Sequence, residues 1–279
     1  MDLDQAYNNV AAAGNFPEIM ARFRLRSAAT YAAHRWQRDL PCGPAARERI
    51  DWFAQADTGA PTFLFIHGGY WQASDKSDYS FIADGLIEAG FNVGLLEYTL
   101  APEASMSTIV QQVGRALDYL LEHRLALNIG EQVVLAGHSA GGHLAALFRD
   151  HPLVTLAMPI SGLMDLEPIS QCWLNEKLQL TAEEIRTFSP QRLIAGGAPL
   201  LVTVGASELP ELVRHSRDYA SACTAAGQNV TLVEVPGCNH FQVLEDLARV
   251  DGVQLRALLA NPSAPLRAAS GANAPSLQN

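Results

Sequence analysis

The middle of the chain alternates short apolar runs with longer stretches that place apolar residues at helical spacing. The apolar runs are largely continuous rather than alternating with polar positions, which is typical of strands covered on both faces of a sheet. They predict strands at 62–66, 92–98, 132–136, 155–160, 199–204 and 230–235. The amphipathic stretches between them predict helices at 78–89, 105–124, 140–148, 210–226 and 241–259.

Strands that alternate with helices in this way predict an α/β fold, with a mostly parallel central sheet and helices on both of its faces. Such a sheet uses most of the chain. We therefore expect a single domain over residues 1–260, although a length of 279 residues would also allow two domains.

Three segments fall outside the alternation. Residues 1–60 contain helix-like pieces, and residues 48–53 within them predict an additional strand at the edge of the sheet. Residues 162–190 separate two strands by more than an ordinary connection, which predicts a lid-like insertion or a pocket wall. Residues 261–279 are rich in alanine, proline and serine and predict a flexible C-terminal tail.

Charge and composition narrow the classes of partner. The chain has 19 Lys and Arg against 29 Asp and Glu, a net charge of −10, which argues against binding to nucleic acid or to anionic membranes. No apolar run approaches the roughly 20 residues that span a bilayer, and the N-terminus lacks the features of a secretory signal. The four cysteines are far apart, as expected for free thiols in a reducing compartment. We expect a cytoplasmic protein; its oligomeric state stays open, a homodimer included.

The strongest chemical signal is the GHSAG motif at 137–141. It follows the predicted strand 132–136 directly and precedes the predicted helix 140–148. This context is that of a nucleophile elbow, in which a tight turn exposes the serine at a helix N-terminus. The alternative is an ordinary glycine-rich turn between a strand and a helix. We favour the elbow and predict that Ser139 is a nucleophile.

A serine hydroxyl needs a base to remove its proton, and in an elbow enzyme the acid and the histidine follow in the order Ser, Asp/Glu, His. His240 stands just after the last predicted strand, and no other histidine downstream of Ser139 has such a position. The acid is expected after the strand 199–204, where Glu208 lies nearest the strand end. Asp165 and Glu211 remain as alternatives.

An oxyanion intermediate also needs hydrogen-bond donors. The segment HGGYW at 67–71 follows the predicted strand 62–66 and is similar to the glycine-rich loops that supply backbone N–H groups. We expect Gly68, Gly69 and Ala140 to form the oxyanion hole, and His67 to fix the loop by hydrogen bonding. A plain Gly-Gly turn is the alternative.

The chain offers no motif for a cofactor or a metal. The glycine-rich stretch 137–142 lacks the lysine of a phosphate-binding loop. HExxH and paired metal-ligand spacings are also missing from the sequence. We therefore expect catalysis without a cofactor and without a metal ion.

Taken together, the motifs from about residue 43 to 245 resemble the arylformamidase (kynurenine formamidase) branch of the α/β-hydrolases, near the hormone-sensitive-lipase-like esterases. The matching segments are HGGYWQ at 67–72 followed by Asp75-Lys76, GHSAGGHL at 137–144, SGLMDLEP at 161–168 and NHF at 239–241. The resemblance implies hydrolysis of N-formyl-L-kynurenine to kynurenine and formate, without a metal, in tryptophan catabolism. It carries the family's triad onto Ser139, Glu208 and His240. Many members have aspartate where this chain has Glu208.

The substrate follows from the sequence less directly. Tyr70, Trp71 and Phe241, beside the catalytic motifs, and Trp173, in the 162–190 insertion, are candidates for an aryl pocket, although each could equally pack beneath a loop. We therefore predict a serine hydrolase that cleaves a small acyl group, formyl by preference, from an aryl amine. The alternatives are a general aryl-ester or aryl-acylamide hydrolase in aromatic-compound degradation and a non-catalytic relative that binds a ligand.

Overall fold

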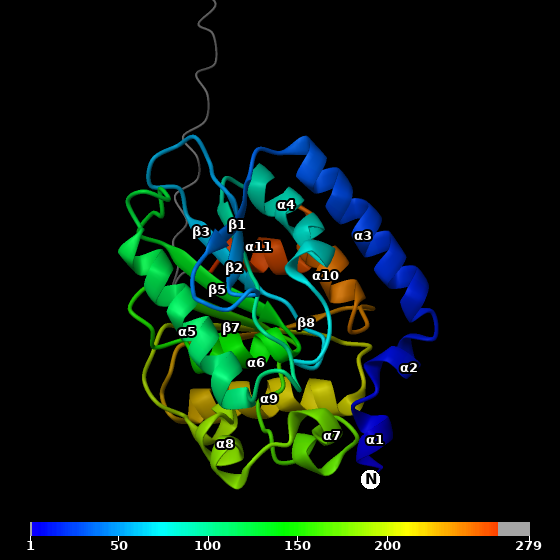
Figure 1. The fold of residues 1–279 in the computed structure, drawn as a ribbon. Coiled ribbons are helices and arrows are strands. Elements are labelled where there is room, and N and C mark those ends of the chain that lie inside the picture. The colour runs from blue at the N-terminus through cyan, green and yellow to red at the C-terminus, as the bar shows by residue number, and fades with distance from the viewer. Residues whose placement is uncertain (1, 262–279) are drawn as a thin grey trace, which may run out of the picture.

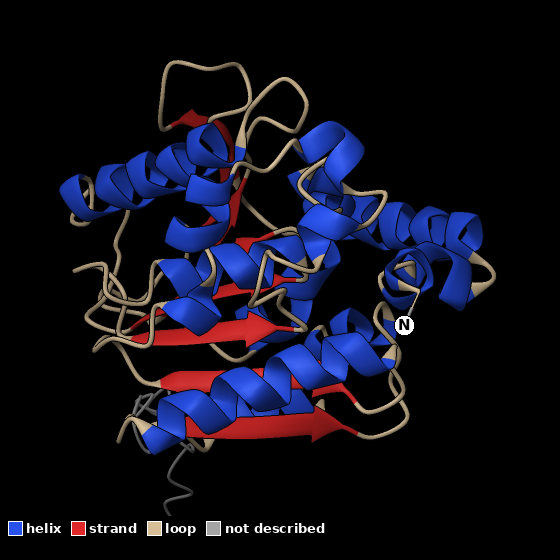
Figure 2. Cartoon of the chain, turned by 90° about the horizontal axis from the view of Figure 1, so that it is seen from below, coloured by secondary structure: helices blue, strands red, loops and turns tan. Residues whose placement is uncertain are grey.

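The computed structural model describes residues 2–261, and its strands form one eight-stranded sheet with helices on both faces (Figures 1 and 2). The strands are β1 (Gln37–Pro41), β2 (Arg49–Phe53), β3 (Thr62–Ile66), β4 (Asn92–Leu96), β5 (Val133–His138), β6 (Leu156–Ile160), β7 (Leu200–Gly205) and β8 (Val230–Val235). Their order across the sheet is β1-β2-β4-β3-β5-β6-β7-β8. The strands from β4 to β8 run parallel, whereas β2 is antiparallel to both β1 and β4. The predicted α/β class and mostly parallel sheet are confirmed.

The helices differ more in length than the sequence predicts. They are α1 (Leu3–Ala6), α2 (Asn9–Ala13), α3 (Phe16–Ala33), α4 (Ala83–Glu88), α5 (Met106–Glu122), α6 (Ala140–Leu147), α7 (Asn175–Leu178), α8 (Ala182–Thr187), α9 (Pro210–Ala225), α10 (Gln242–Leu247) and α11 (Val253–Leu259). Short 3-10 turns cover Lys76–Asp78, Ser80–Ile82, Ile169–Gln171 and Pro190–Arg192. Within these described residues no helix is both long and apolar enough to cross a membrane.

Two apolar layers hold the helices against the sheet. Successive residues of a strand point to opposite faces, so Leu64 and Ile66 of β3 join one layer while Phe63 and Phe65 join the other. The first layer contains residues of α5, α6 and α9 and of the 162–190 segment. The second contains residues of α3, α4, α10 and α11. Burial on both faces explains why the central strands, β3 to β7, are largely apolar in the sequence.

Two predicted helices are wrong in extent. The helix predicted at 78–89 forms as two 3-10 turns followed by the short α4. The helix predicted at 241–259 is interrupted between α10 and α11. There the Asp246 carboxylate accepts hydrogen bonds from the backbone N–H groups of Val253 and Gln254. Since these are free N–H groups at a helix start, the carboxylate begins a second helix instead of continuing the first.

The strand predicted at 48–53 exists as β2, but its predicted place at the edge of the sheet is wrong. The edge is taken by β1, which pairs with β2. Asp51 of β2 adds to this pairing, because its carboxylate accepts a hydrogen bond from the Asp39 backbone N–H of β1 at 2.9 Å. The same carboxylate accepts a hydrogen bond from the Tyr31 hydroxyl of α3 at 2.7 Å. The sequence of β1 is too polar to suggest a strand.

The tail expected at 261–279 lies outside the described residues, except for Asn261, whose backbone N–H donates to the Leu258 carbonyl. The 162–190 segment forms short helices whose apolar side chains join the first layer. A cavity of about 420 Å³ lies between residues 102–107 and 177–184, and none of the candidate catalytic residues lines it. The lid role of the 162–190 segment stays a prediction.

Candidate active site

Ser139 occupies the tight turn between β5 and α6. Its backbone has φ 56° and ψ −115°, a region that non-glycine residues rarely adopt and that marks stored strain. The turn is held by two backbone hydrogen bonds. The Ser139 N–H donates to the Ile160 carbonyl at 2.8 Å, and its own carbonyl accepts from the His143 N–H at 3.0 Å. The sequence-predicted elbow therefore has the expected place between a strand and a helix.

The two glycines of the motif are required by close backbone approach. A Cβ atom on Gly141 would lie 2.0 Å from the Ile66 carbonyl oxygen, and one on Gly137 would lie 2.1 Å from the Gly141 carbonyl oxygen. Real Cβ atoms do not approach backbone oxygens this closely, so any larger residue would have to displace β3 or the elbow itself.

His240 and Glu208 form a buried pair at the carboxyl ends of β8 and β7. His240 Nδ1 lies 2.6 Å from Glu208 Oε2. The other carboxylate oxygen, Oε1, accepts hydrogen bonds from the Ser161 hydroxyl at 2.5 Å and from the Gly205 backbone N–H at 2.8 Å. Both carboxylate oxygens are thus engaged. The proton of His240 is directed to Nδ1, which leaves Nε2 as the nitrogen that can act as a base.

The other two candidates for the acid, Asp165 and Glu211, are paired with arginine residues instead of with His240. Asp165 is 3.4 Å from the Arg192 guanidinium, and Glu211 is 2.7 Å from the Arg214 guanidinium. Glu211 also belongs to the first turn of α9, as expected from its sequence position. Of the three candidates, the structure brings only Glu208 to His240.

His138 joins the elbow to the histidine loop. Its Nε2 donates to the backbone carbonyl of His240 at 2.8 Å, and the two imidazole rings lie with centroids 4.4 Å apart. The pKa of His138 is held well below its usual value, mainly by burial and secondly by the nearby His240, so this ring stays neutral. Within the described residues Ser139 Oγ makes no hydrogen bond to His240. Such catalytic contacts are often long without substrate and tighten when it binds.

The HGG loop lies against the elbow. A Cβ atom on Gly68 would be 2.9 Å from the His138 carbonyl oxygen and 3.1 Å from Ser139 Cβ. Gly69 has φ +102°, and its Cβ would be 2.3 Å from the Ala73 carbonyl oxygen. Ala140 is the first residue of α6, where backbone N–H groups have no partner within the helix. This placement fits the oxyanion hole predicted from the sequence, whose role stays a prediction.

His67 fixes that loop through a buried ionic cluster. Its Nε2 lies 2.8 Å from Glu97 Oε1 and its Nδ1 lies 2.7 Å from the Gly68 carbonyl. The Arg47 guanidinium reaches the same Glu97 oxygen at 2.8 Å. Although burial opposes a charge on His67, Glu97 raises the pKa of His67 above its usual value. The sequence analysis did not single out Glu97, although it is the one charged residue in the predicted strand 92–98.

The aromatic pocket candidates have different surroundings. Phe241 lines the cavity beside His240. Tyr70 donates its hydroxyl proton to the Tyr7 carbonyl at 2.8 Å. Trp71 is fully buried, with its ring 5.1 Å from that of His143, and Trp173 meets the Tyr70 ring edge-on at 5.5 Å. Of these four aromatic candidates, Phe241 alone lines the cavity beside His240.

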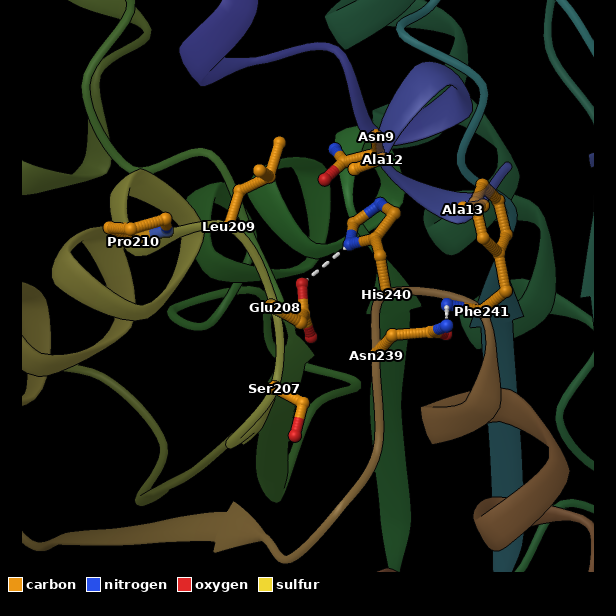
Figure 3. Close-up of a pocket in the computed structure, with 10 residues that line it drawn as sticks. All are labelled: Asn9, Ala12, Ala13, Ser207, Glu208, Leu209, Pro210, Asn239, His240 and Phe241. Carbon is orange, nitrogen blue, oxygen red and sulfur yellow. Dashed lines mark hydrogen bonds and ion pairs between the residues drawn. The ribbon is translucent and has the colours of Figure 1, made fainter.

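That cavity has a volume of about 120 Å³ and is closed on one side by the N-terminal segment. Residues 207–210 and 239–241 contribute the loops after β7 and β8, and Asn9, Ala12 and Ala13 contribute the other wall. Figure 3 shows the α2 residues on the opposite side of the His240 imidazole from Glu208. Nothing in the sequence pattern indicates that α2 reaches this site.

Tyr7 ties the N-terminal segment to α9. Its hydroxyl lies 2.8 Å from His215 Nε2 and donates to Glu211 at 3.3 Å. His215 Nδ1 accepts from the backbone N–H of Met164 at 2.9 Å, so its proton is on Nε2 and points to Tyr7. Burial, with Arg214 adding to it, lowers the pKa of His215 to about 4.

This neutral histidine predicts a loss of stability in mild acid. The unfolded chain binds a proton at His215 below about pH 6.5, whereas the folded chain binds it only near pH 4, so protons favour unfolding between these values. We expect His215 alone to remove about 2 kcal/mol of unfolding free energy between pH 7 and pH 5. Urea unfolding of the wild type and of His215→Gln at both pH values measures this. An equal drop in the two proteins would contradict it.

Among residues 2–261, no group of three or more histidine, cysteine, aspartate or glutamate side chains is arranged to hold a metal ion. The four cysteines are free thiols. The candidate groups at the carboxyl edge of the sheet are Ser139, His240 and Glu208.

The chain is similar to proteins of known family and structure. A family model described as BD-FAE matches residues 50–149, which hold the HGG loop and the elbow. The kynurenine formamidase of Salmo salar is 32% identical over 231 residues, 77% of this chain and 77% of that protein. The kynurenine formamidase of Danio rerio is 30% identical over 225 residues, 75% of this chain and 76% of that protein. A crystal structure from Silicibacter sp. TM1040 with a provisional thioesterase assignment matches with a TM-score of 0.83 at 30% identity, over 93% of this chain and 100% of that chain.

Proposed function

The chain belongs to the α/β-hydrolase family that includes the kynurenine formamidases, and from this premise we propose that it hydrolyses N-formylated aryl amines, N-formyl-L-kynurenine above all. The products would be the free amine, kynurenine, and formate. The observation that carries the proposal is the buried pair of Glu208 and His240, 2.6 Å apart, at the sheet edge where the elbow places Ser139.

In the proposed reaction His240 Nε2 takes the Ser139 hydroxyl proton as the serine oxygen attacks the formyl carbon. The carbonyl electron pair moves onto the oxygen, which the N–H groups of Gly68, Gly69 and Ala140 would bind. The imidazolium then gives its proton to the amide nitrogen, the C–N bond breaks, and the amine leaves a formyl ester on Ser139. Water, deprotonated by His240, cleaves that ester to formate.

Glu208 contributes by position and charge. Its Oε2 keeps the His240 proton on Nδ1 and stabilises the imidazolium that forms in each half of the reaction. Since Oε1 is held by the Ser161 hydroxyl and the Gly205 N–H, the carboxylate cannot rotate away from the imidazole without losing two hydrogen bonds. This arrangement supports glutamate in a role that many family members give to aspartate.

The first test is a comparison of kcat/KM for N-formyl-L-kynurenine, an N-acetylated aryl amine and p-nitrophenyl acetate. We expect formylkynurenine to lead by tenfold or more, which corresponds to about 1.4 kcal/mol of selective transition-state binding. If the activated ester is favoured and formylkynurenine is barely turned over, the substrate proposal fails and the hydrolytic mechanism remains.

One observation favours the second candidate, a general aryl-ester or aryl-acylamide hydrolase. Apart from Glu208 and His240, which pair with each other, none of the residues that line the cavity is charged. An amino acid substrate carries an ammonium and a carboxylate, and this cavity offers no free charge to either. Uncharged aryl amides or esters would not need one, and the same three-substrate comparison separates the two candidates.

A further inference from the structure

Asn9 carries an unsatisfied hydrogen-bond acceptor beside the candidate base. The residue is 97% buried (3% exposed), and its Oδ1 has no hydrogen-bond partner among the described residues. It lines the same cavity as His240, and Figure 3 shows its amide next to the imidazole. A buried polar atom without a partner costs free energy, and such atoms call for an explanation, a ligand among them.

The contacts of Tyr70 set the direction of the Asn9 amide. The Tyr70 hydroxyl donates its single proton to the Tyr7 carbonyl and accepts from the Asn9 backbone N–H at 3.0 Å. Burial raises the pKa of Tyr70 to about 12, and the Asn9 side chain lies close enough to that hydroxyl to lower this pKa as a donor would. Because the hydroxyl has no second proton, it can only accept from the amide, so Nδ2 faces Tyr70 and Oδ1 faces away from it.

The segment that carries Asn9 is well anchored. Tyr7 is fully buried against His215 and Glu211 on α9, and the Asn8 side chain caps α2 by accepting the Ala11 N–H. These contacts hold the Oδ1 acceptor at a defined place before any substrate arrives. An acceptor placed in advance gains affinity because little conformational freedom is lost on binding.

We propose that Asn9 Oδ1 accepts a hydrogen bond from the N–H of the scissile amide, and so makes the site selective for amides over esters of the same shape. This inference rests on the proposed function, because it assigns the acceptor to the leaving group that His240 protonates. The substrate class it implies is a secondary amide, whose nitrogen carries one hydrogen.

The geometry of amide cleavage explains why such an acceptor matters. When Ser139 attacks, the amide nitrogen becomes pyramidal, and its lone pair must point at His240 Nε2 to receive the proton. Its N–H must then point elsewhere, and an acceptor there holds the nitrogen in the reactive orientation. An ester leaving oxygen carries no hydrogen and gains nothing from this acceptor.

The test uses a pair of substrates that differ only at the leaving atom, formanilide and phenyl formate, with rates corrected for spontaneous hydrolysis. Asn9→Leu keeps similar size and removes the acceptor. We expect its kcat/KM for formanilide to fall about tenfold while that for phenyl formate stays within twofold of the wild type. The control is Val10→Ala, on the exposed side of the same helix, which should leave both values unchanged.

The possible results distinguish failure of the Asn9 assignment from failure of the proposed formamidase activity. A selective loss on formanilide supports the assignment of Asn9. An equal change on both substrates, or none, overturns that assignment and leaves the proposed formamidase activity standing. A wild-type protein that hydrolyses phenyl formate but not formanilide overturns both the assignment and the proposed amide substrate.

Discussion

Replacing Ser139 with alanine is expected to lower kcat for any acyl substrate by about 10⁵–10⁶-fold. The nucleophile and its base act as one unit, so loss of the serine oxygen removes nearly all that the histidine and the acid contribute. The residual rate would come from the loop N–H groups and from substrate binding alone.

The structure makes this substitution a clean one. Ser139 is buried between β5 and α6, and its turn is held by backbone hydrogen bonds that alanine also makes. We therefore expect Ser139→Ala to fold like the wild type, which thermal unfolding would check. The matched control is Ser221→Ala, at an exposed position of α9, which should keep full activity.

A second readout does not depend on the choice of substrate. A fluorophosphonate probe reacts with an activated serine, so it should label the wild type and Ser221→Ala but not Ser139→Ala. Retention of a tenth of the wild-type activity by Ser139→Ala would show that Ser139 is not the nucleophile. An unlabelled wild type would favour a non-catalytic, ligand-binding protein.

Replacing Glu208 with glutamine should cost on the order of 10⁴ in kcat. The reason lies in the two donors at Oε1, the Ser161 hydroxyl and the Gly205 N–H, which would select the amide oxygen of glutamine on their side. The amide NH₂ would then face His240 Nδ1 and make it an acceptor. The imidazole proton would move to Nε2, where the ring could no longer take the proton of Ser139.

Asp165→Asn is the matched control. It also removes one carboxylate charge from the segment between Ser139 and His240, but Asp165 has no contact with His240. Its carboxylate lies beside Arg192 and is partly exposed, so kcat should stay within twofold of the wild type. If Asp165→Asn were as damaging as Glu208→Gln, the assignment of the acid would have to be abandoned.

The strands other than β1 could be predicted because each has a recognisable run of apolar or β-branched residues. β3 and β8 match the predicted ranges residue for residue. β3 is buried on both faces, whereas β8 is a partly exposed edge strand whose β-branched residues, Val and Thr, give the signal. β1 could not be predicted, because an edge strand rich in polar residues looks like a loop in the sequence. It is held by its pairing with β2 and by the hydrogen bond from its Asp39 N–H to the Asp51 carboxylate, contacts that only the folded chain reveals.

The parts of the candidate site that could not be predicted depend on contacts between residues far apart in the sequence. The elbow, the HGG loop and the histidine loop are local patterns, and the structure places all three at one edge of the sheet. Tyr7 and Asn9 carry no local signal at all. The two residues that the Tyr7 hydroxyl contacts, Glu211 and His215, lie more than 200 positions further along the chain, and no sequence spacing predicts these contacts.

The three hydrogen bonds of Glu208 also constrain how this site could change during evolution. An aspartate at 208 is shorter by one methylene, so on the present backbone it could keep the donors of Ser161 and Gly205 or reach His240, but not both. Exchange between the two acids therefore requires a coordinated change in the turn 205–208. The acid and its turn form an epistatic unit, and a lineage can cross from one acid to the other only by altering both.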